Sequence, residues 1–177
     1  MSHPNETKEE IVNVILETSM GDIELELYKS KMPITVGNFI ELAEADFYDG
    51  VKFHRVIRDF MLQAGDPKTT DDSAMALWGQ GGPGYTIEDE FVDGLSNLRG
   101  TISMANTGLP NSGGSQFFIN TNDNISLDFD KAPASSKHPV FGRVVSGIDV
   151  VNAINVVPTE GPDRPVEPVV IENVVIK

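Results

Sequence analysis

Residues 53–66 read FHRVIRDFMLQAGD, and they predict two short strands joined by a tight turn. Both strands are strongly apolar, yet they carry Arg55 and Gln63, and Phe60 falls in the turn between them. A strand that has apolar residues on both faces and still holds an arginine is expected to do something outside its own core. The other segments of the chain indicate what that is.

Strand alternation assigns the apolar residues around this stretch to two faces, because successive side chains of a strand point in opposite directions. In MLQA, Met61 and Gln63 share one face, and in QFFI, Gln116 and Phe118 do the same. The opposite face of both segments is expected to fill the interior of a barrel, with Leu62, Ala64, Phe117 and Ile119.

The outward face combines apolar rings with a few donors. Phe60 or Met61 taken alone would be an ordinary core residue. Together with Phe118, two glutamines and an arginine, however, they form an exposed group with the composition of a small apolar pocket that holds a few placed polar groups.

The rest of the chain predicts a mainly β domain with two helices. Residues 11–18 and 23–28 are expected to form a hairpin around a turn at 19–22, and residues 33–45 an amphipathic helix that begins at a proline. Short strands follow as far as residue 145, and a second helix is expected over 148–155. The last strand, in PVEPVVIENVVIK, is expected to pair with the hairpin. This pattern favours a closed or nearly closed antiparallel barrel.

The composition limits the classes of function. The 177 residues suit one domain over 10–177 preceded by a flexible arm over 1–9. The net charge of −14 argues against binding to nucleic acid or to a membrane surface. The absence of cysteine excludes disulfides and thiolate chemistry. No apolar segment resembles a signal peptide or a membrane helix, so we expect a cytoplasmic protein.

Several patterns are weighed and set aside. Residues 79–84, GQGGPG, match a nucleotide-binding pattern, but a strand-like run follows instead of a helix, so a loop is expected. His3, His54 and His138 have no partners at metal-ligand spacing, and Ser115 is not in a nucleophile elbow. No metal, cofactor or covalent intermediate is therefore expected.

Three motifs together carry a resemblance. FHRVIRDFMLQAGD, SMANTG at 103–108 and GGSQFFIN at 113–120 closely resemble the cyclophilin family of peptidyl-prolyl cis-trans isomerases, over residues 11–177, in its single-domain, prokaryotic-like form. The resemblance implies a closed eight-stranded antiparallel β-barrel capped by two helices. It also implies a rotamase that assists protein folding by turning X-Pro bonds in proline-containing peptides and in unfolded or folding proteins. No cofactor is implied, and a monomer is the simplest expectation.

The resemblance also implies roles for individual residues. Arg55 would be the catalytic arginine, assisted by Gln63 and Phe60. The substrate-binding residues would be Met61, Gly79, Ala105, Asn106, Thr107, Gln116, Phe118, Leu127 and His138. The alternative is a proline-peptide binding module or holdase without useful turnover, but such a protein would not need Arg55.

Two positions depart from the family pattern. Ser126 stands where the members known for binding cyclosporin carry tryptophan, which puts cyclosporin binding, but not catalysis, in question. The segment 128–137 is longer than the shortest family form, which affects how His138 approaches the pocket.

Overall fold

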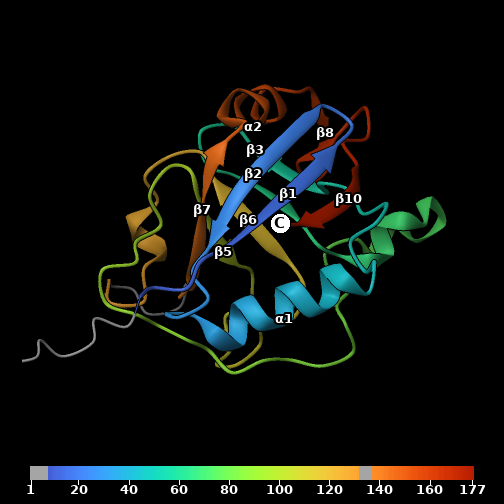
Figure 1. Cartoon of the computed structure of the whole chain (residues 1–177). Coiled ribbons are helices and arrows are strands. Elements are labelled where there is room, and N and C mark those ends of the chain that lie inside the picture. The colour runs from blue at the N-terminus through green and yellow to red at the C-terminus, as the bar shows by residue number, and fades with distance from the viewer. Residues whose placement is uncertain (1–7, 132–136) are drawn as a thin grey trace, which may run out of the picture.

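The computed structural model describes residues 8–131 and 137–177, and its centre is a strongly curled antiparallel sheet (Figure 1). The strands of the chain are β1 (Val12–Thr18), β2 (Gly21–Leu27), β3 (Arg55–Ile57), β4 (Met61–Ala64), β5 (Thr101–Met104), β6 (Phe117–Asn120), β7 (Val140–Ser146), β8 (Thr159–Glu160), β9 (Arg164–Pro165) and β10 (Ile171–Ile176). Eight of them form one sheet in the order β10-β1-β2-β7-β5-β6-β4-β3, and β8 and β9 form a separate hairpin. Most of the arm expected over residues 1–9 lies outside the described residues, as does 132–136 of the long segment before His138.

The predicted N-terminal hairpin and its pairing with the C-terminal strand are confirmed. β1 pairs with β2 as far as Thr18 and Gly21, so the turn itself is shorter than the four residues expected. Gly21 has a φ of +129°, and a Cβ there would lie 2.8 Å from Val150 of the second helix. Any side chain would therefore be strained as well as crowded at this position. β10 pairs with the other edge of β1.

The sheet is a half-barrel and not the closed barrel that we expected. β10 and β3 are the two ends of the sheet and do not pair with each other, but the residues just before them form an isolated bridge between Lys52 and Val170. Hydrogen bonds such as that from Phe53 N to Val169 O (2.9 Å) flank this bridge. Pro168 comes next and has no N–H, so the pairing cannot extend further in that direction.

The outer edge of β3 is covered by the β8–β9 hairpin. Val56 N donates to Asp163 O across 2.8 Å, in the turn of that hairpin. An unpaired strand edge exposes backbone donors and acceptors, and covering it with a short hairpin satisfies one of them without adding a ninth strand to the sheet. The strand that carries Arg55 is thus held from both sides.

Both predicted helices are present, as α1 (Pro33–Glu44) and α2 (Ile148–Asn155). They lie on opposite sides of the curled sheet in Figure 1. Pro33 opens α1 as expected, and the free N–H groups of Ile34 and Thr35 donate to the carboxylate of Glu90. A negative charge at a helix N-terminus satisfies these donors and favours the helix dipole.

Three short 3-10 helices were not predicted from the sequence: η1 (Pro67–Thr70), η2 (Asp72–Leu77) and η3 (Ile125–Leu127). Asp66 caps the first and Asp71 the second, each by accepting a backbone N–H two residues further on. Such side-chain turns are typical of aspartate and leave no apolar periodicity in the sequence.

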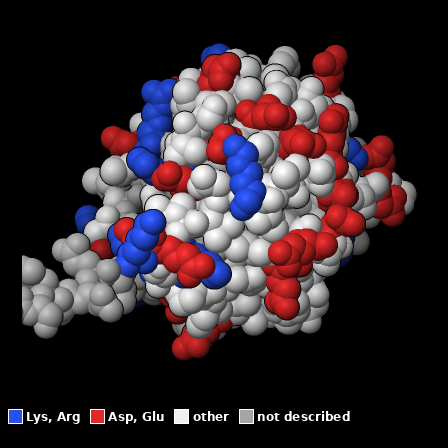
Figure 2. Space-filling model, in the orientation of Figure 1, with Lys and Arg blue, Asp and Glu red and all other residues white. Residues whose placement is uncertain are grey.

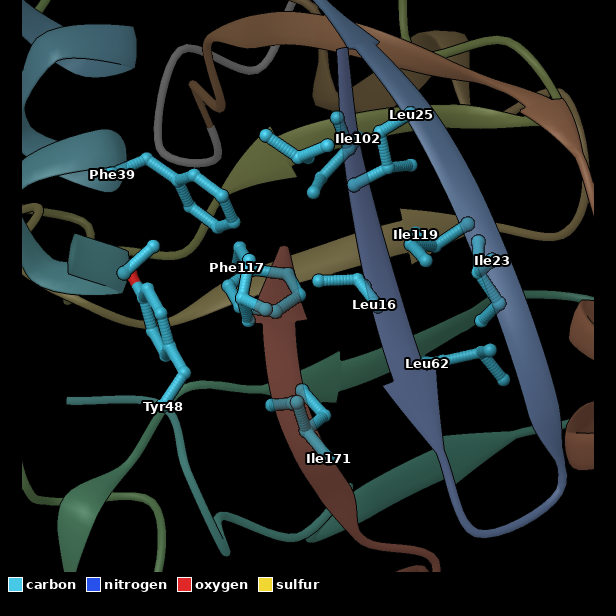
Figure 3. Packing of buried hydrophobic residues seen from close by; sticks show 14 of the residues in the cluster. Leu16, Ile23, Leu25, Phe39, Tyr48, Leu62, Ile102, Phe117, Ile119 and Ile171 are labelled. Atoms are coloured by element: carbon cyan, nitrogen blue, oxygen red, sulfur yellow. The ribbon is translucent and has the colours of Figure 1, made fainter. Parts of the chain in front are cut away.

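The core fills the inside of the half-barrel (Figure 3). Leu62, Ala64, Phe117 and Ile119 are all fully buried there, so the predicted inward face is confirmed. The Phe117 ring lies edge-on to Phe39 and Tyr48, with centroids 5.6 Å away in each case.

Acidic side chains cover more of the visible surface than basic ones, which gather toward the left of the view (Figure 2). Among the described residues, neither helix is long and apolar enough to cross a membrane.

Replacing Phe117 by alanine should lower the free energy of unfolding by about 3–5 kcal/mol, because the cavity left between α1 and the sheet cannot close fully. Urea unfolding followed by circular dichroism measures this. Leu109→Ala is the control, since Leu109 is 69% exposed and its loss should cost less than about 0.5 kcal/mol. Equal losses in the two variants would contradict the packing described here.

Candidate active site

The register of three neighbouring strands aligns the central residues of the site. Arg55 of β3 lies opposite Gln63 of β4, and Gln63 in turn lies opposite Phe118 of β6. Directly paired residues point to the same face of a sheet. The three side chains therefore form a row on the outer face of the half-barrel, as strand alternation predicted.

The predicted exposure of this face is wrong for two of its members. Met61 and Phe118 are only 1% and 4% exposed, although neither belongs to the main core cluster. They are buried because loops from other parts of the chain surround them, so that this face of the sheet becomes the base of a hollow. Phe60 is half-buried, and the Arg55 side chain remains exposed.

This hollow is a cavity of about 220 Å³, and every described residue that lines it is one of the predicted site residues. The lining consists of Arg55, Phe60, Met61, Gln63, Ala105, Asn106, Phe118, Leu127 and His138. We call it the proline cavity, for the role argued below. Its described walls come from five separate segments of the chain, and its rings and thioether provide an apolar interior.

The other three predicted residues, Gly79, Thr107 and Gln116, line a larger adjoining hollow of about 440 Å³. Gln63, Ala105 and Asn106 line both hollows, so the two meet along these residues. The predicted residues thus lie together on one face, but they surround two depressions and not one.

Gln63 is oriented by a chain of amide hydrogen bonds. Its Nε2 donates to Oε1 of Gln116 across 2.9 Å. Nε2 of Gln116 donates in turn to the carbonyl oxygens of Gly79 (3.0 Å) and Gly81 (2.8 Å). The Gln63 amide nitrogen is thus oriented toward Gln116, while Arg55 lies opposite Gln63 on β3.

His138 closes one side of the proline cavity in a neutral form. Its ring lies edge-on to Phe118 at 5.2 Å between centroids, and its Nδ1 is 3.0 Å from the carbonyl oxygen of Met104. Burial lowers the pKa of His138, so the ring is uncharged at neutral pH. A neutral ring in which Nδ1 donates to Met104 presents its other nitrogen as an acceptor.

Asp66 shapes the glycine-rich loop, and its role was missed in the sequence. It is fully buried and accepts backbone N–H groups from Lys68, Gly79 and Gly81. A Cβ at Gly81 would lie 1.9 Å from Oδ1 of Asp66, so only glycine fits there. The loop expected at 79–84 is confirmed as a loop, and it wraps around a carboxylate of the protein itself.

A buried polar network, also missed in the sequence, ties the walls of the proline cavity together. Asn124 donates to the carbonyl oxygen of Phe60 (2.8 Å), and Asn97 donates to that of His138 (3.2 Å). Asp128 accepts from Ser96 and from both the backbone and side chain of Asn97. Buried polar groups that are fully paired favour one arrangement of the chain, here that of two cavity walls.

The Asp128 carboxylate is held in its charged form. Burial acts to raise its pKa, but the hydrogen bonds from Ser96 and Asn97 outweigh burial and hold the pKa of Asp128 below its usual value. The only sequence signal for this role is an aspartate that follows the apolar Leu127, and that signal is weak.

Comparison with known proteins identifies the family of this chain. The family model described as cyclophilin type peptidyl-prolyl cis-trans isomerase/CLD matches residues 13–176. The chain belongs to the cyclophilin family. This places it among the peptidyl-prolyl cis-trans isomerases, as the three sequence motifs predicted.

Relatives and solved cyclophilin structures match this chain over almost the whole domain. The human peptidyl-prolyl cis-trans isomerase-like 1 is 44% identical over 158 residues, which is 89% of this chain and 87% of the human protein. A peptidyl-prolyl cis-trans isomerase of Arabidopsis thaliana is 46% identical over 165 residues, but these cover 93% of this chain and only 24% of the plant protein. The crystal structure of a Cryptosporidium parvum cyclophilin superposes with a TM-score of 0.84 at 29% identity, covering 95% of this chain and 98% of that one.

Asp128→Asn should lower the free energy of unfolding at pH 7 by about 1–3 kcal/mol, because an amide cannot accept all the hydrogen bonds that the carboxylate accepts. The native pKa lies below the unfolded value of about 3.9, so the stabilisation by Asp128 is present above that pH and is lost as the pH falls through the native pKa. The difference between variant and wild type should therefore shrink as the pH falls below the unfolded value of about 3.9 and through the lower native pKa. Urea unfolding as a function of pH measures it.

Asp130→Asn is the matched control, because Asp130 is an exposed carboxylate in the same segment, and its ion pair in the described part of the chain is with Lys131. It should change stability little at any pH. A penalty for Asp128→Asn that does not depend on pH would contradict the charged network.

Proposed function

We propose that this cyclophilin accelerates rotation about X-Pro bonds in peptides and in folding proteins without a covalent intermediate, and that Arg55 stabilises the twisted bond. The observation that carries the proposal is the row Arg55–Gln63–Phe118, which sets a charged donor beside an apolar cavity. A proline ring is compact and apolar, and it suits a cavity of about 220 Å³ lined by Phe60, Met61 and Phe118.

The chemistry requires the amide resonance of the X-Pro bond to be lost on the way to the transition state. That resonance gives a barrier of about 18–20 kcal/mol. As the bond twists, the proline nitrogen becomes pyramidal and regains a lone pair. A donor that binds this lone pair or the proline carbonyl stabilises the twisted state more than either planar state.

Arg55 is suited to this task by its charge and by its surroundings. A guanidinium offers a fixed fork of donors and stays protonated at all relevant pH values. No acidic side chain is among the described residues that line the proline cavity, so no carboxylate there competes for these donors. Gln63 and the rings opposite can hold one side of the bond while the other side turns.

A cyclophilin of similar structure supports the substrate class. A second crystal structure of the Cryptosporidium parvum protein was determined in the presence of the dipeptide Ala-Pro. It superposes on 93% of this chain with a TM-score of 0.81 at 29% identity. We extend this to the present chain as part of the proposal.

Arg55→Ala should lower kcat/KM on an Ala-Pro peptide by about 10²–10³, the loss expected when one charged donor to the transition state is removed. Because the Arg55 side chain is exposed, the variant should remain folded. A coupled isomerisation assay with circular dichroism of the same samples measures both.

Arg58→Ala is the matched control, since Arg58 is an exposed arginine in the turn that follows β3 and does not line the proline cavity. It should retain near wild-type activity. If Arg55→Ala also retained it, the proposed mechanism would be wrong. If the wild type bound the peptide without accelerating isomerisation, the chain would be a binding module and not an enzyme.

Cyclosporin should inhibit the wild type weakly, and Ser126→Trp should strengthen inhibition by about tenfold or more. Ser126 is exposed and precedes Leu127, which lines the proline cavity, so an indole there would extend its apolar wall and add one N–H donor. Inhibition of Ala-Pro turnover measures the effect, and Ile125→Trp controls for an added surface indole. Strong inhibition of the wild type would contradict the expectation drawn from Ser126.

A further inference from the structure

A third cavity lies on the other side of Arg55 and is not part of the site described so far. It measures about 180 Å³, and its walls include Arg55, Met75, Trp78, Gly79, Pro162 and Arg164. We call it the Trp78 pocket. It shares Arg55 and Gln63 with the proline cavity, and Gly79 and Gln63 with the larger hollow. A peptide whose proline occupies the proline cavity therefore passes close to the mouth of the Trp78 pocket.

The Trp78 ring is a firmly held wall of this pocket. It follows η2, and its Nε1 donates to the carbonyl oxygen of Asp71 across 3.1 Å. Lys52 Nζ lies 5.1 Å from the ring centroid, and the guanidinium carbon of Arg164 lies 6.0 Å from it. Both cations are attracted to the π face of the indole, and they bring positive charge to this side of the site.

Arg164 enters the pocket from the hairpin that covers β3. Its Nε is buried and has no hydrogen-bond partner among the described residues. Its one ion pair in the described part of the chain is with Glu160, at 3.5 Å, and the Glu160 side chain is 52% exposed. A half-exposed pair at this distance is weak, so most donors of the guanidinium remain available to another anion.

The charge of the lining is positive, in contrast to the chain as a whole. Arg55 and Arg164 are the charged residues that line the Trp78 pocket, and no aspartate or glutamate is among the described lining residues. His54 also lines it, and burial lowers the pKa of His54, so that ring is neutral at pH 7. Glu160, which pairs with Arg164 at 3.5 Å, is not among the described lining residues. Two other acids have partners elsewhere: Asp66 accepts from the glycine loop, and Asp72 pairs with Lys52 at 2.9 Å.

We propose that the Trp78 pocket binds an anionic side chain of the substrate, either a carboxylate or a phosphate, at a position that flanks the proline. The Arg164 guanidinium would bind the anion with paired N–H donors, a geometry that carboxylates and phosphates share. Trp78 and Met75 would exclude water from one side of this ion pair and so strengthen it. The inference rests on the proposed isomerase function and adds a preference to it.

The test measures isomerisation by protease-free NMR exchange on peptides built around Ala-Pro. Each peptide carries either glutamate or its neutral isostere glutamine at one position. The positions tested are the two before the Ala-Pro pair and the two after it. At one position, the glutamate peptide should have a kcat/KM roughly twofold to fivefold above that of the glutamine peptide, as expected for one partly exposed ion pair. The ratio of kcat/KM for phosphoserine and serine peptides at the same position then shows whether a phosphate or a carboxylate is preferred.

Variants assign the preference to this pocket. Arg164→Gln should remove it while leaving turnover of the plain Ala-Pro peptide unchanged, and Arg58→Gln, which removes an equal charge outside the pocket, should keep it. Glu160→Gln should increase it, because Glu160 competes for Arg164 and is itself exposed. This variant tests the idea even if Arg164→Gln folds poorly.

Three results would overturn the inference: equal rates for the glutamate and glutamine peptides at every position, a preference that survives Arg164→Gln, or a preference that Arg58→Gln removes to the same degree. In each case the protein would still accelerate isomerisation of the plain Ala-Pro peptide. A failure of the isomerase proposal itself would instead show as no acceleration of any peptide, including the uncharged one.

Discussion

The pleat of β6 is the constraint on which both the core and the site depend. Phe117 and Phe118 are neighbours in the chain and must point to opposite faces of the sheet. One ring packs between α1 and the inner face, and the other forms part of the proline cavity. A slip of one residue in the register of β6 would therefore exchange a core ring for a site ring and disrupt both at once. The register of β6 thus fixes both the packing of the barrel and the alignment of Arg55 with Gln63 and Phe118.

The pleat positions the strand residues at the base of the site, whereas buried polar contacts position the loops that form its walls. Asp128, Asn97 and Asn124 connect the backbone beside Phe60 to that beside His138, although these segments lie far apart in sequence. Asp66 does the same for the glycine loop. Such contacts matter in a half-barrel, because the loop that holds Asp128 and the glycine loop are not strands of its sheet. The carboxylates act as structural centres around which the loops are organised.

Local patterns in the sequence predict the parts of this structure that depend on periodicity. Alternation in MLQA and QFFI assigned Leu62 and Phe117 to the core, and Pro33 marked the start of α1. The open sheet, the burial of Met61 and the role of Asp128 could not be predicted in this way. They depend on contacts between distant segments, such as the 31 residues that separate Asn97 from Asp128. The resemblance to the family indicated the residues that line the proline cavity, but not the division of this face into separate hollows.

Charge acts on two length scales in this molecule. The net charge of −14 repels an acidic peptide at a distance, whereas Arg55 and Arg164 attract it within the Trp78 pocket. At an ionic strength of about 0.15 M the Debye length is roughly 8 Å, so the long-range repulsion is largely screened. A pair that is partly removed from water is screened much less. Physiological salt therefore weakens the general repulsion more than the local attraction, and an acidic surface is compatible with recognition of an anionic side chain beside the proline.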